Sequence, residues 1–142
     1  MNRINVGRVI VGGIVAGVVL FFMLGVVHHK LLMVDWLAWK GSVAGVIQLP
    51  SPRYSLKRWL AMSLVAGLTG VWIYAGIRPR FGAGPKTALL AGFLLWLAGY
   101  FTGALNALAL GVLPHHIIKV ALIGEFVAVL VSTFIGAAIY TE

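Results

Sequence analysis

The hydrophobic residues of this chain gather in four long stretches that are separated by short polar breaks. The stretches extend over about 9–27, 59–77, 87–113 and 117–140. A helix of ~19 residues, the length of the first stretch, is ~28 Å long, which is close to the ~30 Å hydrocarbon core of a bilayer. The pattern therefore predicts an all-α membrane protein, with one integral membrane domain over residues 1–142 and four transmembrane helices.

The first apolar stretch follows a basic start of the kind that also occurs in secretory signal peptides. Arg3 and Arg8 supply its charge. A signal peptide has a shorter apolar region, followed by a cleavage site of the Ala-x-Ala type. This stretch is longer and no such site follows it, so we expect a retained transmembrane helix.

The longest connection, residues 28–58, carries a helical pattern that is too short to span a membrane. Leu32, Trp36 and Trp39 recur at helical spacing, and Asp35 lies among them. Tryptophan favours the headgroup layer, where its ring meets lipid and its N–H group meets water. We expect an interfacial helical segment between the first and second transmembrane helices.

The break after the second apolar stretch combines helix-breaking residues with positive charge. The helix-breaking residues are Pro79, Gly82, Gly84 and Pro85. They predict a tight hairpin that no helix crosses. The cations are Arg78, Arg80 and Lys86. Because they lie beside the start of the third helix, we expect them to bind an anion there, and a lipid headgroup is the simplest candidate.

This hairpin resembles that of a family of small, uncharacterised bacterial four-helix integral membrane proteins. The resembling residues are Trp72 to Gly76 and the sequence IRPRFGAGPKTALLAG that follows them. Similar positions elsewhere in the chain are Arg8, Gly12, Gly13, Ala16, Gly17 and the pair Asp35-Trp36. The resemblance covers most of the chain, and it implies the four-helix membrane fold and no particular activity.

Composition supports a membrane location. Hydrophobic residues make up 61% of the chain and charged residues 10%, and the mean hydropathy is +1.03. In a soluble domain about a quarter of the residues are charged. The net charge of +8 would favour nucleic acid in a soluble chain, but here the cations flank apolar stretches, so we expect contact with the lipid bilayer and no nucleic-acid partner. The chain has no Cys, which excludes thiolate catalysis and Cys-ligated metals.

Four spans place both chain termini on one side of the membrane. The cations of that side are Arg3, Arg8, Arg78, Arg80 and Lys86, and those of the other side are Lys30, Lys40, Arg53, Lys57, Arg58 and Lys119. Cytoplasmic loops carry an excess of Lys and Arg, but counts of five and six do not decide the orientation. We expect a bacterial inner membrane. We also expect the termini to be cytoplasmic, because the hairpin is short and densely charged.

Small residues recur at every fourth position in the predicted helices. They are Gly13 and Gly17 in the first helix, Gly99, Gly103, Ala107 and Gly111 in the third, and Gly124, Ala128, Ser132 and Gly136 in the fourth. Such rows allow membrane helices to approach each other closely. We expect the third and fourth helices to pack on each other, and the alternative is that the rows face a partner subunit or a second copy.

Glu125 is the sharpest candidate for chemistry, because it lies well inside the fourth apolar stretch. A charged residue at the centre of a membrane helix costs roughly 2.5–3.5 kcal/mol on insertion scales, and such a residue is by default functional or paired. One interpretation is a proton or cation site. The other is a hydrogen-bonded acid that fixes helix packing, for example against Asn106 or Thr102.

The histidines form two adjacent pairs, His28-His29 and His115-His116, and the predicted topology places both at the same membrane face as Asp35. Imidazoles with a carboxylate can bind zinc or copper, or the metal of a haem or chlorin. The spacing matches no metal motif, and histidines that meet headgroups and water are the alternative. Our main expectation is therefore that the chain binds no cofactor. The alternative is that it binds a haem, a chlorin or a metal.

The sequence offers few components for catalysis, and we expect no enzyme activity. The acids are Asp35, Glu125 and Glu142, and neither a nucleophile elbow nor a phosphate-binding loop is present. The favoured function is an accessory or structural subunit within a larger membrane protein complex. The alternatives are a small oligomeric transporter or channel-like protein built around Glu125, and a tetrapyrrole- or metal-binding subunit that uses His28 with His115 or His116.

Overall fold

The computed structural model describes residues 4–48 and 50–141, and long helices make up most of it. Each of four segments is long and apolar enough to cross a membrane, and they are Val6–Leu31, Pro52–Phe81, Pro85–Leu110 and His115–Ile139. The protein is thus an all-α membrane protein with four spanning helices, which confirms the predicted fold class. Arg3 and Glu142 lie outside the described residues.

Two of the four segments change helix type along their length. The first consists of α1 (Val6–Val26) and the π-helical turn η1 (Val27–Leu31). The third consists of α4 (Pro85–Leu95), the π-helical segment η2 (Trp96–Phe101) and α5 (Thr102–Leu110). The other two are the helices α3 (Pro52–Phe81) and α6 (His115–Ile139), and the short helix α2 (Met33–Ser42) follows η1.

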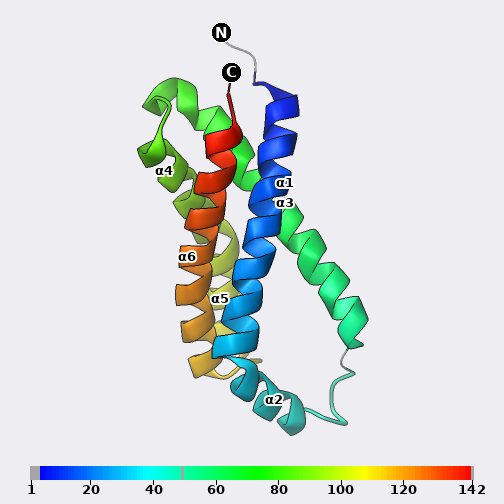
Figure 1. Ribbon diagram of the computed structural model, residues 1–142. Helices are drawn as coiled ribbons and strands as arrows, with labels where there is room; N and C mark the ends of the chain where they lie inside the picture. Colours follow the sequence, from blue (N-terminus) through cyan, green and yellow to red (C-terminus); the bar gives the residue numbers. More distant parts are fainter. Residues whose placement is uncertain (1–3, 49, 142) are drawn as a thin grey trace.

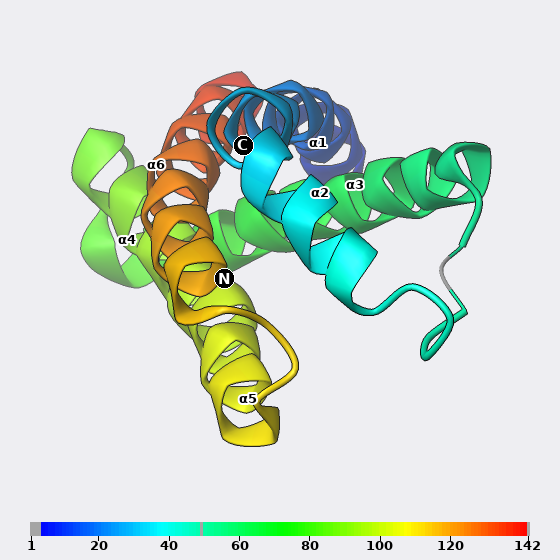
Figure 2. The same ribbon diagram turned by 90° about the horizontal axis from the view of Figure 1, so that it is seen from below.

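Helix α1 lies between α3 and α6 and packs on both, while α4 packs on α6 and α3 (Figure 1). The beginning of α1, the end of α6 and the hairpin between α3 and α4 all lie at one end of the bundle. Helix α2 lies at the opposite end and runs across it (Figure 2). This position of α2 matches the helical segment predicted between the first two spans.

Glycines allow the backbones of α1 and α3 to touch. A Cβ atom on Gly13 would lie 2.7 Å from the Cα atom of Leu68, and one on Gly17 would lie 2.7 Å from the Cα atom of Leu64. Gly67 of α3 faces back between the two glycines, and a Cβ atom there would lie 2.5 Å from the backbone oxygen of Gly13. Real Cβ atoms do not approach other atoms so closely, so the contact requires glycine on both helices.

The small residues of α6 face α1 and its extension η1. Gly124 lies against the side chain of Val27, and Gly136 lies against Gly12 and Ala16. A Cβ atom on Gly136 would be 2.6 Å from the backbone oxygen of Gly12. The row on the fourth span therefore serves the contact with the first span.

The row on the third span has no neighbour within the described chain. Apart from the adjoining backbone of the same segment, no atom of the described chain lies within 4 Å of a Cβ atom built on Gly99, Gly103 or Gly111. Helix α4 contacts α6 through other residues, including Gly92, and Figure 2 shows α5 well apart from α1 and α3. The third and fourth spans thus pack on each other as expected, but the small-residue row of the third span takes no part in the contact. The alternative, that the row on the third span faces another chain, stays a prediction.

Helix α3 continues through Pro79 to Phe81, so the prediction that no helix crosses the breaker cluster is wrong at Pro79. Proline removes one backbone hydrogen bond and crowds the preceding turn, but this proline lies in the last turn, where little helix follows it. The helix ends just before Gly82 and Gly84, whose φ angles of 83° and 137° favour glycine.

Candidate functional site

A buried polar site begins at His28, which lies in η1. A π-helical turn departs from the α-helical repeat and is frequent at functional sites. Nδ1 of His28 accepts a hydrogen bond of 3.2 Å from Nε1 of Trp36 on α2. The His28 ring also lies 4.7 Å, centre to centre, from the ring of Trp59 on α3. Two tryptophans from two other helices therefore fix the imidazole.

The second ring nitrogen of His28 faces Glu125 on α6. Nε2 of His28 lies 3.5 Å from Oε1 of Glu125, and the two side chains are 12% and 16% exposed. An indole N–H group only donates, so Nδ1 of His28 carries no proton while it accepts from Trp36. The proton of the neutral imidazole is therefore on Nε2, where it faces the carboxyl group.

The segment η2 brings Tyr100 to the same acid. The Tyr100 hydroxyl is buried without a hydrogen-bond partner in the part of the chain that the structure describes, and it lies within electrostatic range of Glu125. Trp96, also in η2, donates from Nε1 to the backbone oxygen of Leu122 on α6 at 3.3 Å. This bond ties η2 to the helix that carries Glu125.

Neither polar residue that the sequence placed beside Glu125 pairs with it. Thr102 donates instead to the backbone oxygen of Ala98 on its own helical segment, at 2.5 Å, and Asn106 is exposed on α5. Tyr100 was missed, although a tyrosine inside the third apolar stretch was a usable signal. The pairing of His28 with Glu125 had no sequence signal, because the two residues come from different helices.

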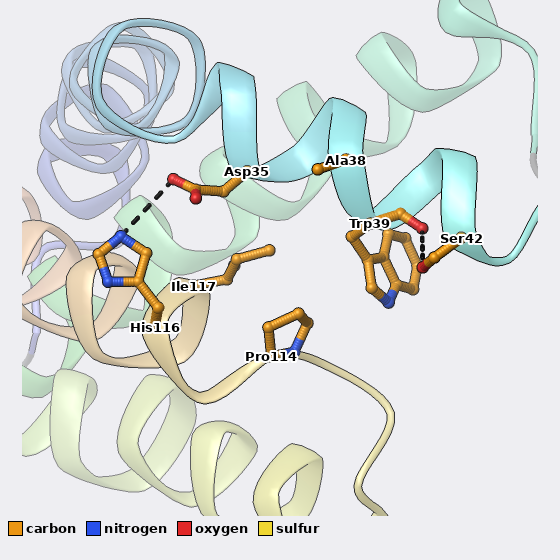
Figure 3. A pocket seen from close by; sticks show the side chains of 7 residues that line it. All are labelled: Asp35, Ala38, Trp39, Ser42, Pro114, His116 and Ile117. Atoms are coloured by element: carbon orange, nitrogen blue, oxygen red, sulfur yellow. Dashed lines mark hydrogen bonds and ion pairs between the residues drawn. The ribbon is translucent and has the colours of Figure 1, made fainter.

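A second pair of histidine and acid lies at the surface, where α2 passes the start of α6. Nε2 of His116 lies 3.6 Å from Oδ2 of Asp35, and the side chains are 67% and 37% exposed. Both side chains line a pocket of about 270 Å³. Figure 3 shows them pointing toward each other. The other residues that line this pocket are Ala38, Trp39, Ser42, Pro114 and Ile117.

The two histidine pairs do not converge on one centre. His28 faces Glu125 and His116 faces Asp35, whereas His29 and His115 are exposed. Across residues 4–48 and 50–141, no group of three His, Asp or Glu side chains is arranged to hold a metal ion. His28 has no free lone pair either, because Nδ1 accepts from Trp36 and Nε2 carries the proton. Nε2–H of His28 therefore faces Glu125 as a donor group, at 3.5 Å and without a formed hydrogen bond.

At the opposite end of the bundle, the hairpin turns one cation inward and two outward. The guanidinium carbon of Arg78 lies 5.5 Å from the centre of the Tyr140 ring, a cation–π contact, while Arg80 and Lys86 are exposed. The Thr87 hydroxyl donates to the backbone oxygen of Gly82 at 2.7 Å and closes the turn. Arg80 and Lys86 thus remain accessible to an anionic headgroup.

The third span exposes a polar group within an apolar helix. Asn106 follows Gly103 by about one helical turn, so the two residues lie on one face of α5, and both are exposed. The third span is also the least buried of the four, with 22% of its most apolar window inside the structure. A face that combines open glycines with an amide in this position differs from the other described spans.

No known protein family, no curated protein and no solved structure matches this chain. The resemblance of the hairpin to a bacterial membrane protein family therefore stays a prediction.

Proposed function

We propose that this protein is a non-catalytic integral membrane protein that acts as an accessory or structural subunit of a larger membrane protein assembly. The observation that carries the proposal is the uncovered face of η2 and α5. Gly99 and Gly103 leave open space beside the backbone there, whereas Gly13, Gly17, Gly67, Gly124 and Gly136 are all used for close contacts within the chain.

Asn106 supports the same proposal, because an amide in contact with lipid tails lacks hydrogen-bond partners. Such an unsatisfied polar group costs free energy in hydrocarbon. A second transmembrane helix packed on Gly99 and Gly103 would bring its own polar groups within reach of Asn106. Small residues and one polar residue on a shared face are typical of helix–helix contacts in membranes.

The proposed location is a bacterial inner membrane, with both termini in the cytoplasm. In that orientation the exposed Arg80 and Lys86 would meet the anionic lipids of the cytoplasmic leaflet. The partner is another membrane subunit or a second copy of this chain. Both partners would use the same face of α5.

The test is the mass of the protein, extracted from its native membranes in a mild detergent. We expect the wild-type particle to contain at least one further polypeptide besides the 15.2 kDa chain. Gly103→Leu would release the partner, because its side chain would fill the face. Gly76→Leu is the matched control, since Gly76 on α3 also has no atom within 4 Å of a built Cβ but lies outside the proposed interface.

A wild-type particle with a single chain would overturn the proposal. So would a Gly103→Leu particle with the same partner content as Gly76→Leu. Since neither built Cβ meets another atom of the chain, both variants should keep the helical circular dichroism of the wild type.

A further inference from the structure

Two buried polar groups beside Glu125 lack hydrogen-bond partners in the described part of the chain. They are Nε2 of His28 and the hydroxyl of Tyr100. Buried polar groups in native proteins are nearly always paired, and an unpaired one costs about 1–3 kcal/mol. The Glu125 carboxyl group is 3.5 Å from the first and within electrostatic range of the second. Whether Glu125 carries a proton therefore determines which hydrogen bonds His28 and Tyr100 can form with it.

The hydrogen bond from Trp36 determines what this site can bind. It leaves Nδ1 of His28 as an acceptor and places the imidazole proton on Nε2. A donor N–H group that faces the carboxyl repels a metal cation, which needs lone pairs on its ligands. A proton has no such requirement, because one carboxyl oxygen is enough to hold it.

We propose that Glu125 is a reversible proton-binding site inside the helix bundle, with His28 and Tyr100 as the groups that stabilise both of its states. Without the proton, a small side-chain shift would let the carboxylate accept from Nε2–H of His28, now 3.5 Å from Oε1, and from the unpartnered Tyr100 hydroxyl. With the proton, one carboxyl oxygen still accepts from His28, and the new O–H group donates to the Tyr100 oxygen. The reaction is –COO⁻ + H⁺ ⇌ –COOH, and the Tyr100 hydroxyl changes from donor to acceptor.

The charged side chains on the helices around Glu125 are engaged elsewhere or lie at a distance from it. On α6, Lys119 is exposed and lies more than one turn from Glu125, and α5 carries no titratable residue among Thr102–Leu110. On α2, Asp35 pairs with His116, and on α3 the Arg58 guanidinium donates to Tyr54. His28 from η1 and Tyr100 from η2 are therefore the titratable side chains that face Glu125 in the described chain.

The position of the site suits exchange of a proton with the aqueous phase. Glu125 lies ten residues after the first residue of α6, or ~15 Å along the helix. His28 lies near the carboxyl end of the first span, next to α2. The side chains of His28 and Glu125 are 12% and 16% exposed. The site thus lies on the side of the bundle that α2 covers, and its two side chains are not fully enclosed.

Infrared difference spectroscopy of the purified protein in detergent tests this proposal, because a protonated carboxyl group has its own C=O stretching band. We expect a band that disappears as pH rises and that is absent in Glu125→Gln. Asp35→Asn, the matched change in a surface acid, would leave the band unchanged. Tyr100→Phe removes an O–H donor from the carboxylate, and since hydrogen bonds to a charged acceptor are the stronger ones, it would move the loss of the band to higher pH.

Three results would overturn the proposal. One is a wild-type spectrum that has no pH-dependent carboxyl band, or one whose band persists in Glu125→Gln. Another is a Tyr100→Phe variant whose carboxyl band is lost at the same pH midpoint as that of the wild type. This variant keeps the test decisive even where Glu125→Gln fails to fold. The third is loss of the band on addition of Na⁺ or Zn²⁺ at constant pH, which would assign a cation site. None of these outcomes depends on whether α5 binds a partner.

Discussion

Gly67 of α3 lies directly against the backbone of Gly13 of α1, so that a Cβ atom on Gly67 would approach the Gly13 oxygen to 2.5 Å. This contact fixes where α1 crosses α3. Since α1 also packs on α6, the same crossing determines how η1 and α6 meet. The alignment of His28 with Glu125 therefore depends on glycines that take no part in the polar site.

Gly67→Ala should destabilise the bundle strongly. The added methyl group would force α1 and α3 apart, and overpacking of this kind costs typically ~1–3 kcal/mol. The measurement is the free energy of unfolding in detergent by chemical denaturation. Gly76→Ala, which has open space around its Cβ, is the control and should be neutral or slightly stabilising. Equal effects of the two variants would contradict the close contact.

Trp36→Phe should release His28 from its fixed tautomer. The variant keeps an aromatic ring but loses the N–H group that donates to Nδ1, a bond that contributes about 0.5–1.5 kcal/mol. Nitrogen NMR of labelled histidine should show one neutral tautomer, protonated at Nε2, for wild-type His28 and a mixture for the variant. Trp39→Phe, which removes a similar bond to the backbone oxygen of Val112, should leave the His28 signals unchanged.

Tyr140→Phe should loosen the beginning of α1. The Tyr140 hydroxyl accepts a hydrogen bond of 3.2 Å from the backbone N–H group of Asn5, the residue that caps α1. Without this acceptor, the Asn5 amide should exchange its hydrogen faster, with a loss of about 0.5–1.5 kcal/mol in local stability. Hydrogen exchange by mass spectrometry measures this change. The control Tyr54→Phe, at an exposed tyrosine on α3, should not affect α1.

Asp35→Asn should have a small effect on global stability. The pair with His116 is largely exposed, and exposed ion pairs contribute about 0–1 kcal/mol. A double-mutant cycle with His116→Gln, measured by denaturant unfolding in low and high salt, should give a coupling energy that falls as salt rises. A large coupling that is insensitive to salt would show that the pair has a role beyond the surface contact.

The hydrophobic pattern was sufficient to predict the four spans, because lipid requires ~20 consecutive apolar residues from any spanning helix. It also predicted α2, since Leu32, Trp36 and Trp39 repeat at helical spacing in a segment too short to span. The helix through Pro79 was not predicted, because the effect of a proline depends on how much helix follows it. The four spans, α2 and the end of α3 each depend on residues that are close together in the sequence. Local sequence therefore determines most of this part of the fold.

The sequence also singled out Glu125, since an acid in an apolar helix is costly wherever the helix packs. What it did not decide is the partner of that acid. Asn106 and Thr102 were the partners that the sequence suggested, and neither pairs with Glu125. Three local events determined the result: the π-helical turn at His28, a second π-helical segment at Tyr100, and the indole N–H group of Trp36 at Nδ1 of His28.

The small residues show the same division. Their spacing indicated that helices approach closely, and Gly13, Gly17, Gly124 and Gly136 do face neighbouring helices, but the third row does not. A row of glycines specifies only that a backbone is accessible. Which backbone fills the space depends on the crossing angles of all the helices together, and these follow from contacts between residues far apart in the sequence. The sequence by itself therefore determined the four helices and the acid within them, and only the tertiary structure decided what each glycine row and Glu125 face.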